Sequence, residues 1–307
     1  MTSGAMLRLK ADLLLLLAAA IWGVAFYFQK IAMEHVGPLL FVASRATLAA
    51  LCLAPLAILE ARRAGGFSPP GFLRVGIFAG LAFFSAAVIQ QAGIVTATVT
   101  NSGFLTALYV IFTPLIAWIV LSRPPTTYIW PAVGMAFVGT WLLGGGTLDG
   151  FSFGDGLIAI SAIVWAGHML ITSGASPFGR PVTFTAIQFA VVAVCAWVGA
   201  IAMEPISLDS LLAAAPAIAF VGILSSAVTF TLLAIALKHT PPSEAAILVS
   251  METLFAAAAG AILLGERLPA IGWIGAALMF LATLLVQLGP IIERRLKMRA
   301  KPAPQAE

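Results

Sequence analysis

Charged residues are scarce in this sequence. They make up 9% of its 307 residues, whereas hydrophobic residues make up 61%; ordinary soluble domains have about 25% and about 45–50%. A soluble fold of this length would have to expose large apolar patches. The composition therefore excludes a soluble globular protein and predicts a chain whose solvent is lipid, with spans of about 20 residues each.

Cysteine and histidine are scarce too, with two and three residues respectively. Cys52 and Cys195 each fall within an apolar run, without a CxxC spacing or a histidine nearby. We therefore expect no metal site and interpret both as small packing residues. Nothing in the sequence indicates a cofactor.

The basic residues are dispersed, and the net charge is only +4. They do not form a patch or a stripe interleaved with aromatic residues, so the sequence argues against nucleic-acid binding. Arg8 and Lys10 precede an apolar run that continues through Phe28 without a convincing cleavage site. This pattern favours a retained first span over a signal peptide.

Continuous apolar runs predict an all-α integral membrane protein with ten transmembrane helices. The runs do not alternate between polar and apolar residues, which favours helices over a barrel. The predicted spans are 11–33, 38–59, 72–94, 98–121, 127–145, 155–175, 181–203, 211–237, 242–264 and 270–290.

The loops differ in charge between the two sides of this predicted topology. Ten spans place both termini on one side, and that side carries Arg8, Lys10, Arg62, Arg63, Arg74, Arg123, Arg180, Lys238 and the C-terminal basic cluster. The other side has Arg267 as its clear basic residue, with Glu34, Asp149, Asp155, Glu204, Asp209 and Glu266. The positive-inside rule then predicts cytoplasmic termini in a bacterial inner membrane.

The two halves of the chain resemble each other at one fixed offset, the 143 residues that separate Trp22 from Trp165. The same offset relates Asp12 to Asp155, Pro38 to Pro181, Phe41 to Phe184, Cys52 to Cys195, Phe112 to Phe255, Trp130 to Trp273 and Thr140 to Thr283. Five spans in each half, an odd number, predict inverted topology. Inverted repeats are typical of secondary transporters that bind substrate between the halves.

We accordingly expect a first repeat at 1–146, a second at 147–292 and a basic cytoplasmic tail at 293–307. The sequence resembles the EamA branch of the drug/metabolite transporter superfamily over nearly its whole length. The resemblance is carried by Trp22-Gly23, Arg45, Phe112-Thr113-Pro114-Leu115 and Leu263-Leu264-Gly265-Glu266-Arg267-Leu268. It departs from the family at Ser122-Arg123-Pro124-Pro125, where a Gly-Glu pair is usual, and at Gln188, the repeat counterpart of Arg45.

The resemblance implies a central cavity surrounded by helices one, three, four, six, eight and nine. Within the branch, the nearest functional analogy is the bacterial amino-acid exporter YddG, which implies export of aromatic and other neutral amino acids. Export of drugs, nucleotides or sugars is the alternative, with protons as a candidate coupling ion. The sequence contains no GxGD, GxSG or HExxH motif, which argues against an intramembrane enzyme such as a protease. A scaffold protein would not need buried ionisable residues.

Ionisable residues within the spans are the first candidates for a substrate site, because a charge in lipid faces the bundle interior. Glu252 could bind an ammonium group or a proton, or hold helices together, and its repeat counterpart is Tyr109. His168 could be a cavity hydrogen-bond partner, a proton acceptor or a packing residue. For Arg45, in a helix that is usually peripheral in the superfamily, we favour a structural role over substrate binding.

Aromatic residues complete the predicted site. Trp22, Trp165 and Tyr109 could form a cage around an apolar side chain, or simply pack. Phe83, Phe84 and Gln90 are further candidates for the same space. The predicted cavity set is therefore Trp22, Phe83, Phe84, Gln90, Tyr109, Trp165, His168 and Glu252.

Overall fold

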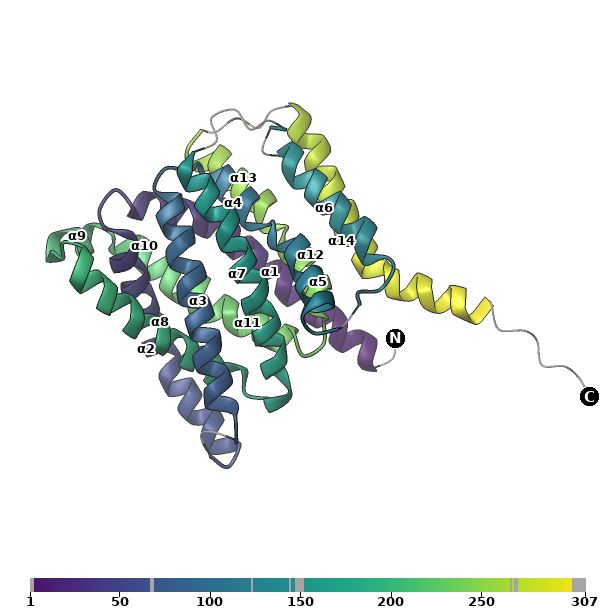
Figure 1. The fold of residues 1–307 in the computed structure, drawn as a ribbon, viewed down its shortest axis with the longest axis horizontal. Helices are drawn as coiled ribbons and strands as arrows, with labels where there is room; N and C mark the ends of the chain where they lie inside the picture. Colours follow the sequence, from purple (N-terminus) through teal and green to yellow (C-terminus); the bar gives the residue numbers. More distant parts are fainter. Residues whose placement is uncertain are drawn as a thin grey trace, which may run out of the picture.

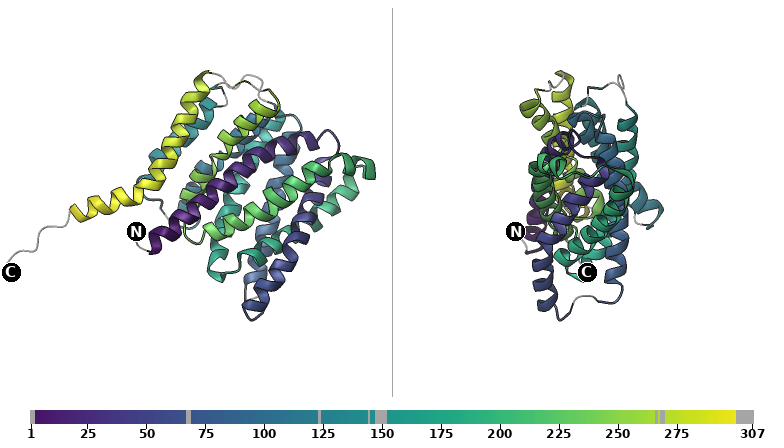
Figure 2. Two further views of the ribbon diagram at one scale, coloured as in Figure 1. Left: turned by 180° about the vertical axis from the view of Figure 1, so that it is seen from behind. Right: turned by 90° about the vertical axis from the view of Figure 1, so that its left-hand side faces the viewer.

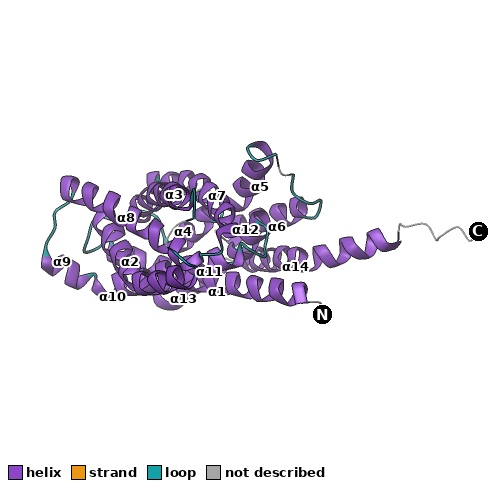
Figure 3. Ribbon diagram, turned by 90° about the horizontal axis from the view of Figure 1, so that it is seen from below, coloured by secondary structure: helices purple, strands orange, loops and turns teal. Residues whose placement is uncertain are grey.

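The apolar runs of the sequence form helices in the computed structural model (Figure 1), and its described part contains helices and loops without strands (Figure 3). The structure describes residues 3–66, 69–122, 124–143, 145–146, 152–265, 267 and 270–299. The helices are α1 (Ser3–Ala32), α2 (Pro38–Arg63), α3 (Phe72–Ile94), α4 (Val99–Thr106), α5 (Tyr109–Ile119), α6 (Ile129–Leu143), α7 (Phe153–Ala175), η1 (Ser176–Phe178), α8 (Pro181–Met203), α9 (Leu208–Ala213), α10 (Ala215–Ala219), η2 (Phe220–Val228), α11 (Thr229–Ala236), α12 (Pro242–Val249), α13 (Glu252–Leu263) and α14 (Ala270–Arg299). The predicted all-α class is confirmed.

Nine stretches of the described chain are long and apolar enough to cross a membrane. Several join consecutive elements: α4 with α5, α12 with α13, and α10 with the π-helix η2 and α11. The span predicted at 127–145 is the exception, since α6 has only 15 residues. At 1.5 Å per residue it is about 22 Å long, shorter than the hydrocarbon core of about 30 Å. Ten complete spans therefore remain a prediction.

The N-terminal end of α1 and the C-terminal end of α14 lie at the same end of the helical bundle (Figures 1 and 2). The side chain of Tyr128, just before α6, lies against Gly289 near the end of this bundle, and its hydroxyl reaches Glu244 at the start of α12. At the opposite end, α1 finishes beside α3, where Lys30 Nζ donates to the carbonyl oxygens of Ile94 and Val95 at 3.1 and 2.9 Å. Lys30 is thus a second basic residue at the end predicted to carry Arg267. Arg123, Asp149, Glu266 and residues 300–307 of the predicted tail lie outside the described residues.

Helices α2 and α8 pack antiparallel, and each supplies a carboxylate that caps the other. Glu204, at the end of α8, accepts the backbone N–H groups of Leu39 and Leu40 at 2.9 and 2.8 Å. Glu60, near the end of α2, accepts those of Val182 and Thr183 at 3.3 and 2.7 Å. The first N–H groups of a helix have no partner within it and attract negative charge. The two caps fix both ends of the pair.

Glycine is required at the first of these caps. A Cβ on Gly37 would lie 2.3 Å from the Glu204 carboxyl group. The residue therefore makes room for the carboxylate that holds the start of α2.

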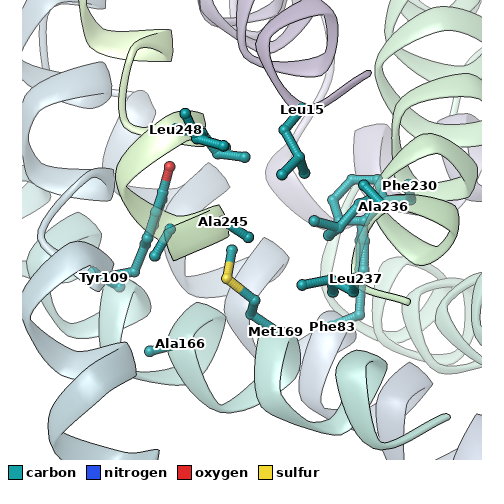
Figure 4. Close-up of a cluster of buried hydrophobic side chains, with 14 of the residues drawn as sticks. Leu15, Phe83, Tyr109, Ala166, Met169, Phe230, Ala236, Leu237, Ala245 and Leu248 are labelled. Atoms are coloured by element: carbon teal, nitrogen blue, oxygen red, sulfur yellow. The ribbon is translucent and has the colours of Figure 1, made fainter. Parts of the chain in front are cut away.

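Helices from the two predicted repeats pack on one another throughout the bundle, including α2 on α8, α3 on α7, α14 on α6 and α1 on α13. The largest buried cluster draws side chains from many elements to the middle (Figure 4), among them Leu15, Phe83, Tyr109, Met169, Phe230 and Leu248. This shared core positions the residues described next.

Candidate functional site

Two of the membrane-spanning helices are broken within the bundle. Ala107 and Leu108 separate α4 from α5, and Ser250 and Met251 separate α12 from α13. Tight i→i−3 hydrogen bonds mark both junctions, such as Val110 N to Ala107 O and Thr253 N to Ser250 O, each 3.0 Å. The junctions are related by the same 143-residue offset as Trp22 and Trp165. Interruptions of this kind are frequent at hinges and at transporter binding sites.

The first residues after the two junctions are Tyr109 and Glu252, and both line one internal cavity of about 70 Å³. The structure brings six of the eight predicted site residues to this cavity, namely Trp22, Gln90, Tyr109, Trp165, His168 and Glu252. It adds residues that the sequence prediction missed, including Phe26, Gln29, Arg45, Thr106, Ser225 and Phe230. The volume is small beside the 300–1,000 Å³ or so of typical ligand sites, so we expect the helices to separate when a substrate enters.

The side chains of Glu252 and Tyr109 lie next to each other at the cavity wall and interact. Their side chains are only 3% and 4% exposed. Neither the Glu252 Oε1 atom nor the Tyr109 hydroxyl makes a hydrogen bond of regular geometry to the protein. Since buried polar groups normally have partners, a ligand that enters the cavity can replace this contact between them with hydrogen bonds of its own.

The position of Glu252 depends on a close helix contact. A Cβ on Gly23 of α1 would lie 2.6 Å from the Glu252 carbonyl oxygen and 2.4 Å from Phe255 Cβ. Gly23 therefore lets α1 approach the start of α13 directly. The adjacent Trp22 lines the cavity.

His168 and Gln90 are each held by a neighbouring polar side chain. His168 Nε2–H donates to Gln188 Oε1 at 2.8 Å, which fixes the ring and occupies one of its nitrogens. Gln90 Nε2 donates to Thr106 Oγ1 at 2.7 Å. Both residues thus combine a packing contact with a place at the cavity wall.

Aromatic rings form one wall of the site around Phe230. Its ring centroid lies 4.8 Å from that of Trp22 and 5.8 Å from that of Trp165, the latter nearly parallel at 26°. Phe83 packs edge-on against Trp165, with ring centroids 4.9 Å apart, and is fully buried. The predicted residue Phe84 packs beside the core and, like Phe83, is not among the residues that line the cavity.

The two tryptophans differ in their hydrogen bonds. Trp22 Nε1 donates to the carbonyl oxygen of Ser225 at 2.8 Å. Ser225 lies in the π-helix η2, and such wide turns loosen the regular backbone bonding and often mark functional sites. The buried Trp165 Nε1, in contrast, has no partner within the described residues.

Arg45 reaches the cavity from α2, where the sequence favoured a purely structural residue. It is 4% exposed, and its Nη1 donates to Ser226 Oγ at a long 3.4 Å. The guanidinium carbon lies 5.8 and 6.0 Å from the ring centroids of Phe41 and Phe83, and Nε has no partner. A charge at bilayer depth costs about 2.5–3.5 kcal/mol on insertion scales. No acidic side chain of the described chain offsets this cost by an ion pair.

An ionic network joins neighbouring elements at the end of the bundle at which α1 begins. Arg8 pairs with Glu244 at the start of α12, and its Nε lies 3.7 Å from Asp12 Oδ2. Tyr128 donates its hydroxyl hydrogen to Glu244 Oε1 at 2.5 Å, and Thr240 donates to Asp12 Oδ1 at 2.7 Å. These contacts connect α1, α12 and the segment before α6.

The corresponding residues at the opposite end are joined more weakly. Asp155 and Asn101 lie at the 143-residue offset from Asp12 and Glu244. Asn101 Nδ2 lies 3.5 Å from Asp155 Oδ1, and Asp155 chiefly forms a capping box with Ser152 at the start of α7. No ion pair joins residues at this end in the part of the chain that the structure describes.

Comparison with known proteins places this arrangement in a family. The model of the EamA-like transporter family matches twice, at residues 9–145 and 152–288. The chain belongs to the EamA-like transporter family. The two matches are themselves separated by the offset between Trp22 and Trp165.

Relatives of this EamA-like transporter span most of its length. An uncharacterized transporter of Archaeoglobus fulgidus is 29% identical over 92% of this chain and 87% of its own. The uncharacterized transporter YwfM of Bacillus subtilis is 27% identical over 91% and 94%. A crystal structure of a protein 18% identical in sequence has a TM-score of 0.70 and covers 96% of this chain and 99% of that one, which shows a shared fold. The family makes the chain a multi-pass membrane transporter of small molecules.

Proposed function

We propose that this EamA-like transporter is a secondary carrier that exports neutral and aromatic amino acids across the bacterial inner membrane. The observation that carries the proposal is the pair of helix junctions that deliver Tyr109 and Glu252 to one cavity. A carboxylate can bind an ammonium group, and the aromatic wall around Phe230 suits an apolar or aromatic side chain. The analogy with YddG points to the same substrates.

The proposed mechanism is alternating access by two inverted repeats, 1–146 and 147–292. It is supported by the two family matches at one offset and by equivalent packing, since α3 packs on α7 as η2 and α11 pack on α1. Helices α1 and α7 also run in opposite directions: α1 ends, and α7 begins, where α3 ends. We infer that the ionic network of Arg8, Asp12 and Glu244 closes one end in this structure.

We propose that the closed end faces the cytoplasm. Basic residues gather there, including Arg180, whose Nη2 donates to Ala64 O just beyond α2. The positive-inside rule assigns such an end to the cytoplasm. In this orientation a substrate would leave towards the opposite end, where Asn101 and Asp155 are joined weakly.

The test is uptake of a panel of radiolabelled amino acids into proteoliposomes, with and without an imposed pH gradient. We expect saturable uptake of neutral and aromatic amino acids, absent from protein-free liposomes, and a Glu252→Gln variant with slower uptake and altered pH dependence. A response to the gradient in the wild type would identify protons as the coupling ion. Saturable transport of drugs, nucleotides or sugars, with no amino acid carried, would replace the proposed substrate.

A further inference from the structure

The cavity contains one basic and one acidic side chain that do not form an ion pair with each other. Arg45 and Glu252 both line it and are both almost fully buried. Within the described residues, the only ion pairs are those of Arg8 with Asp12 and Glu244. Arg45 and Glu252 are thus both present in the cavity and both without an ionic partner.

The two charges approach from different walls. Arg45 belongs to the side formed by α2 and η2, beside Ser226 and Phe83. Glu252 belongs to the side formed by α5 and α13, facing Tyr109. Arg45 Nε and Glu252 Oε1 are among the buried atoms of the cavity that make no regular hydrogen bond to the protein. A guanidinium group matches a carboxylate in geometry and stays charged at any physiological pH, and a carboxylate accepts hydrogen bonds from an ammonium group.

A zwitterion is the ligand that satisfies both walls and leaves the net charge of the cavity unchanged. A simple amine would leave Arg45 unpaired, and a simple acid would leave Glu252 unpaired. Sites built to hydrogen-bond a ligand group discriminate strongly against analogues that lack it, because the buried protein group then loses its partner. The aromatic wall of Trp22, Trp165 and Phe230 would contact the remainder of the ligand.

We propose that the cavity recognises a zwitterionic amino acid at two points, with Arg45 binding the carboxylate and Glu252 binding the ammonium group. This inference rests on the proposed transport function and assigns its substrate-recognition residues. Arg45 is then a specificity-determining residue of the cavity.

The test compares three ligands on the purified full-length protein, by ligand-induced thermal stabilisation titrated to give apparent affinities. L-phenylalanine carries both charges, L-phenylalaninamide lacks the carboxylate, and 3-phenylpropionate lacks the ammonium group. We expect the wild type to bind phenylalanine at least about tenfold more tightly than either analogue, since one charged hydrogen-bond partner is missing in each.

Two variants should each remove one half of this discrimination. Arg45→Gln should bind phenylalanine and phenylalaninamide equally and still reject 3-phenylpropionate. Glu252→Gln should bind phenylalanine and 3-phenylpropionate equally and still reject phenylalaninamide. The exposed charges Arg74 and Glu34 supply matched controls, and Arg74→Gln and Glu34→Gln should keep the wild-type order.

A purely structural role for Arg45 predicts a different result, in which Arg45→Gln weakens all three ligands by one factor or leaves the order unchanged. That result, or equal binding of the three ligands by the wild type, would overturn two-point recognition. If Arg45→Gln does not yield folded protein, Arg45→Lys, which keeps the charge and loses the forked geometry, must narrow the preference for phenylalanine over its amide. Uptake measurements separate the two proposals. If the protein transports phenylalanine but Arg45→Gln keeps the wild-type order of ligand affinities, the amino-acid carrier function stands and two-point recognition is refuted. If the protein transports only other solutes, the amino-acid function itself is refuted.

Discussion

Replacing Glu244 by glutamine should loosen the end of the bundle at which α1 begins. The substitution removes the carboxylate that pairs with Arg8 and accepts from Tyr128. A hydrogen bond to a charged group contributes about 1.5–3 kcal/mol. The Arg8 side chain is 26% exposed and keeps Asp12 within 3.7 Å. We therefore expect a smaller loss of about 1 kcal/mol, or about fivefold in the equilibrium between closed and open states.

Removing the cation should have the larger effect. Arg8→Gln leaves Asp12 and Glu244, both nearly buried, without a positive partner. Unpaired buried charges are more costly than a lost pair, so we expect about 2 kcal/mol, or about thirtyfold. In Arg8→Gln combined with Glu244→Gln, the two effects should sum to less than their separate values, since the residues form one network.

The assay is the rate at which a cysteine in the cavity reacts with a charged, membrane-impermeant thiol reagent. Leu233 lines the cavity and is 2% exposed; Leu233→Cys would be made with both native cysteines replaced by alanine. With reagent added from the side on which α1 begins, the reaction rate should increase from wild type to Glu244→Gln and further to Arg8→Gln. The exposed Arg62 provides the control, since Arg62→Gln should react at the wild-type rate. Equal rates in all four proteins would refute the closing role of the network.

Gly23→Ala should lower thermal stability by about 1–3 kcal/mol, as overpacking does in tight cores, because its Cβ would meet the Glu252 carbonyl oxygen at 2.6 Å; Gly167→Ala, with nothing within 4 Å of the new Cβ, should not. Glu204→Gln should cost about 1 kcal/mol by weakening the cap of α2, while the exposed Glu34→Gln is neutral. Thermal unfolding in one detergent measures all four, and a stable Gly23→Ala or Glu204→Gln protein would contradict the corresponding contact.

The helical fold could be predicted because apolar runs of span length leave few alternatives in lipid. The repeat offset was readable because tryptophan is rare, so Trp22 and Trp165 mark equivalent positions. The breaks after α4 and α12 could not be predicted. Ala107, Leu108, Ser250 and Met251 include no glycine or proline, so the interruption arises from packing that local sequence does not report.

The site was predictable where polarity stood out against an apolar background, as for Glu252, His168 and Gln90. Arg45 stood out equally, but its helix was expected at the periphery, and its place in the cavity follows from the packing of α2 on η2. Phe83 and Phe230 could not be told apart by sequence. Helix periodicity places an aromatic ring on a face, and only the tertiary arrangement decides whether that face is wall or interior.

The reciprocal caps of α2 and α8 hold these two helices in a fixed position relative to each other. Carboxylates hold the start of both helices, so sliding one helix along the other would break several hydrogen bonds at once. Arg45 belongs to this fixed helix pair, whereas Glu252 lies at the break between α12 and α13. We therefore expect a conformational change to leave Arg45 in place and to displace Glu252. A transporter built in this way releases its substrate when Glu252 moves away while Arg45 stays in position.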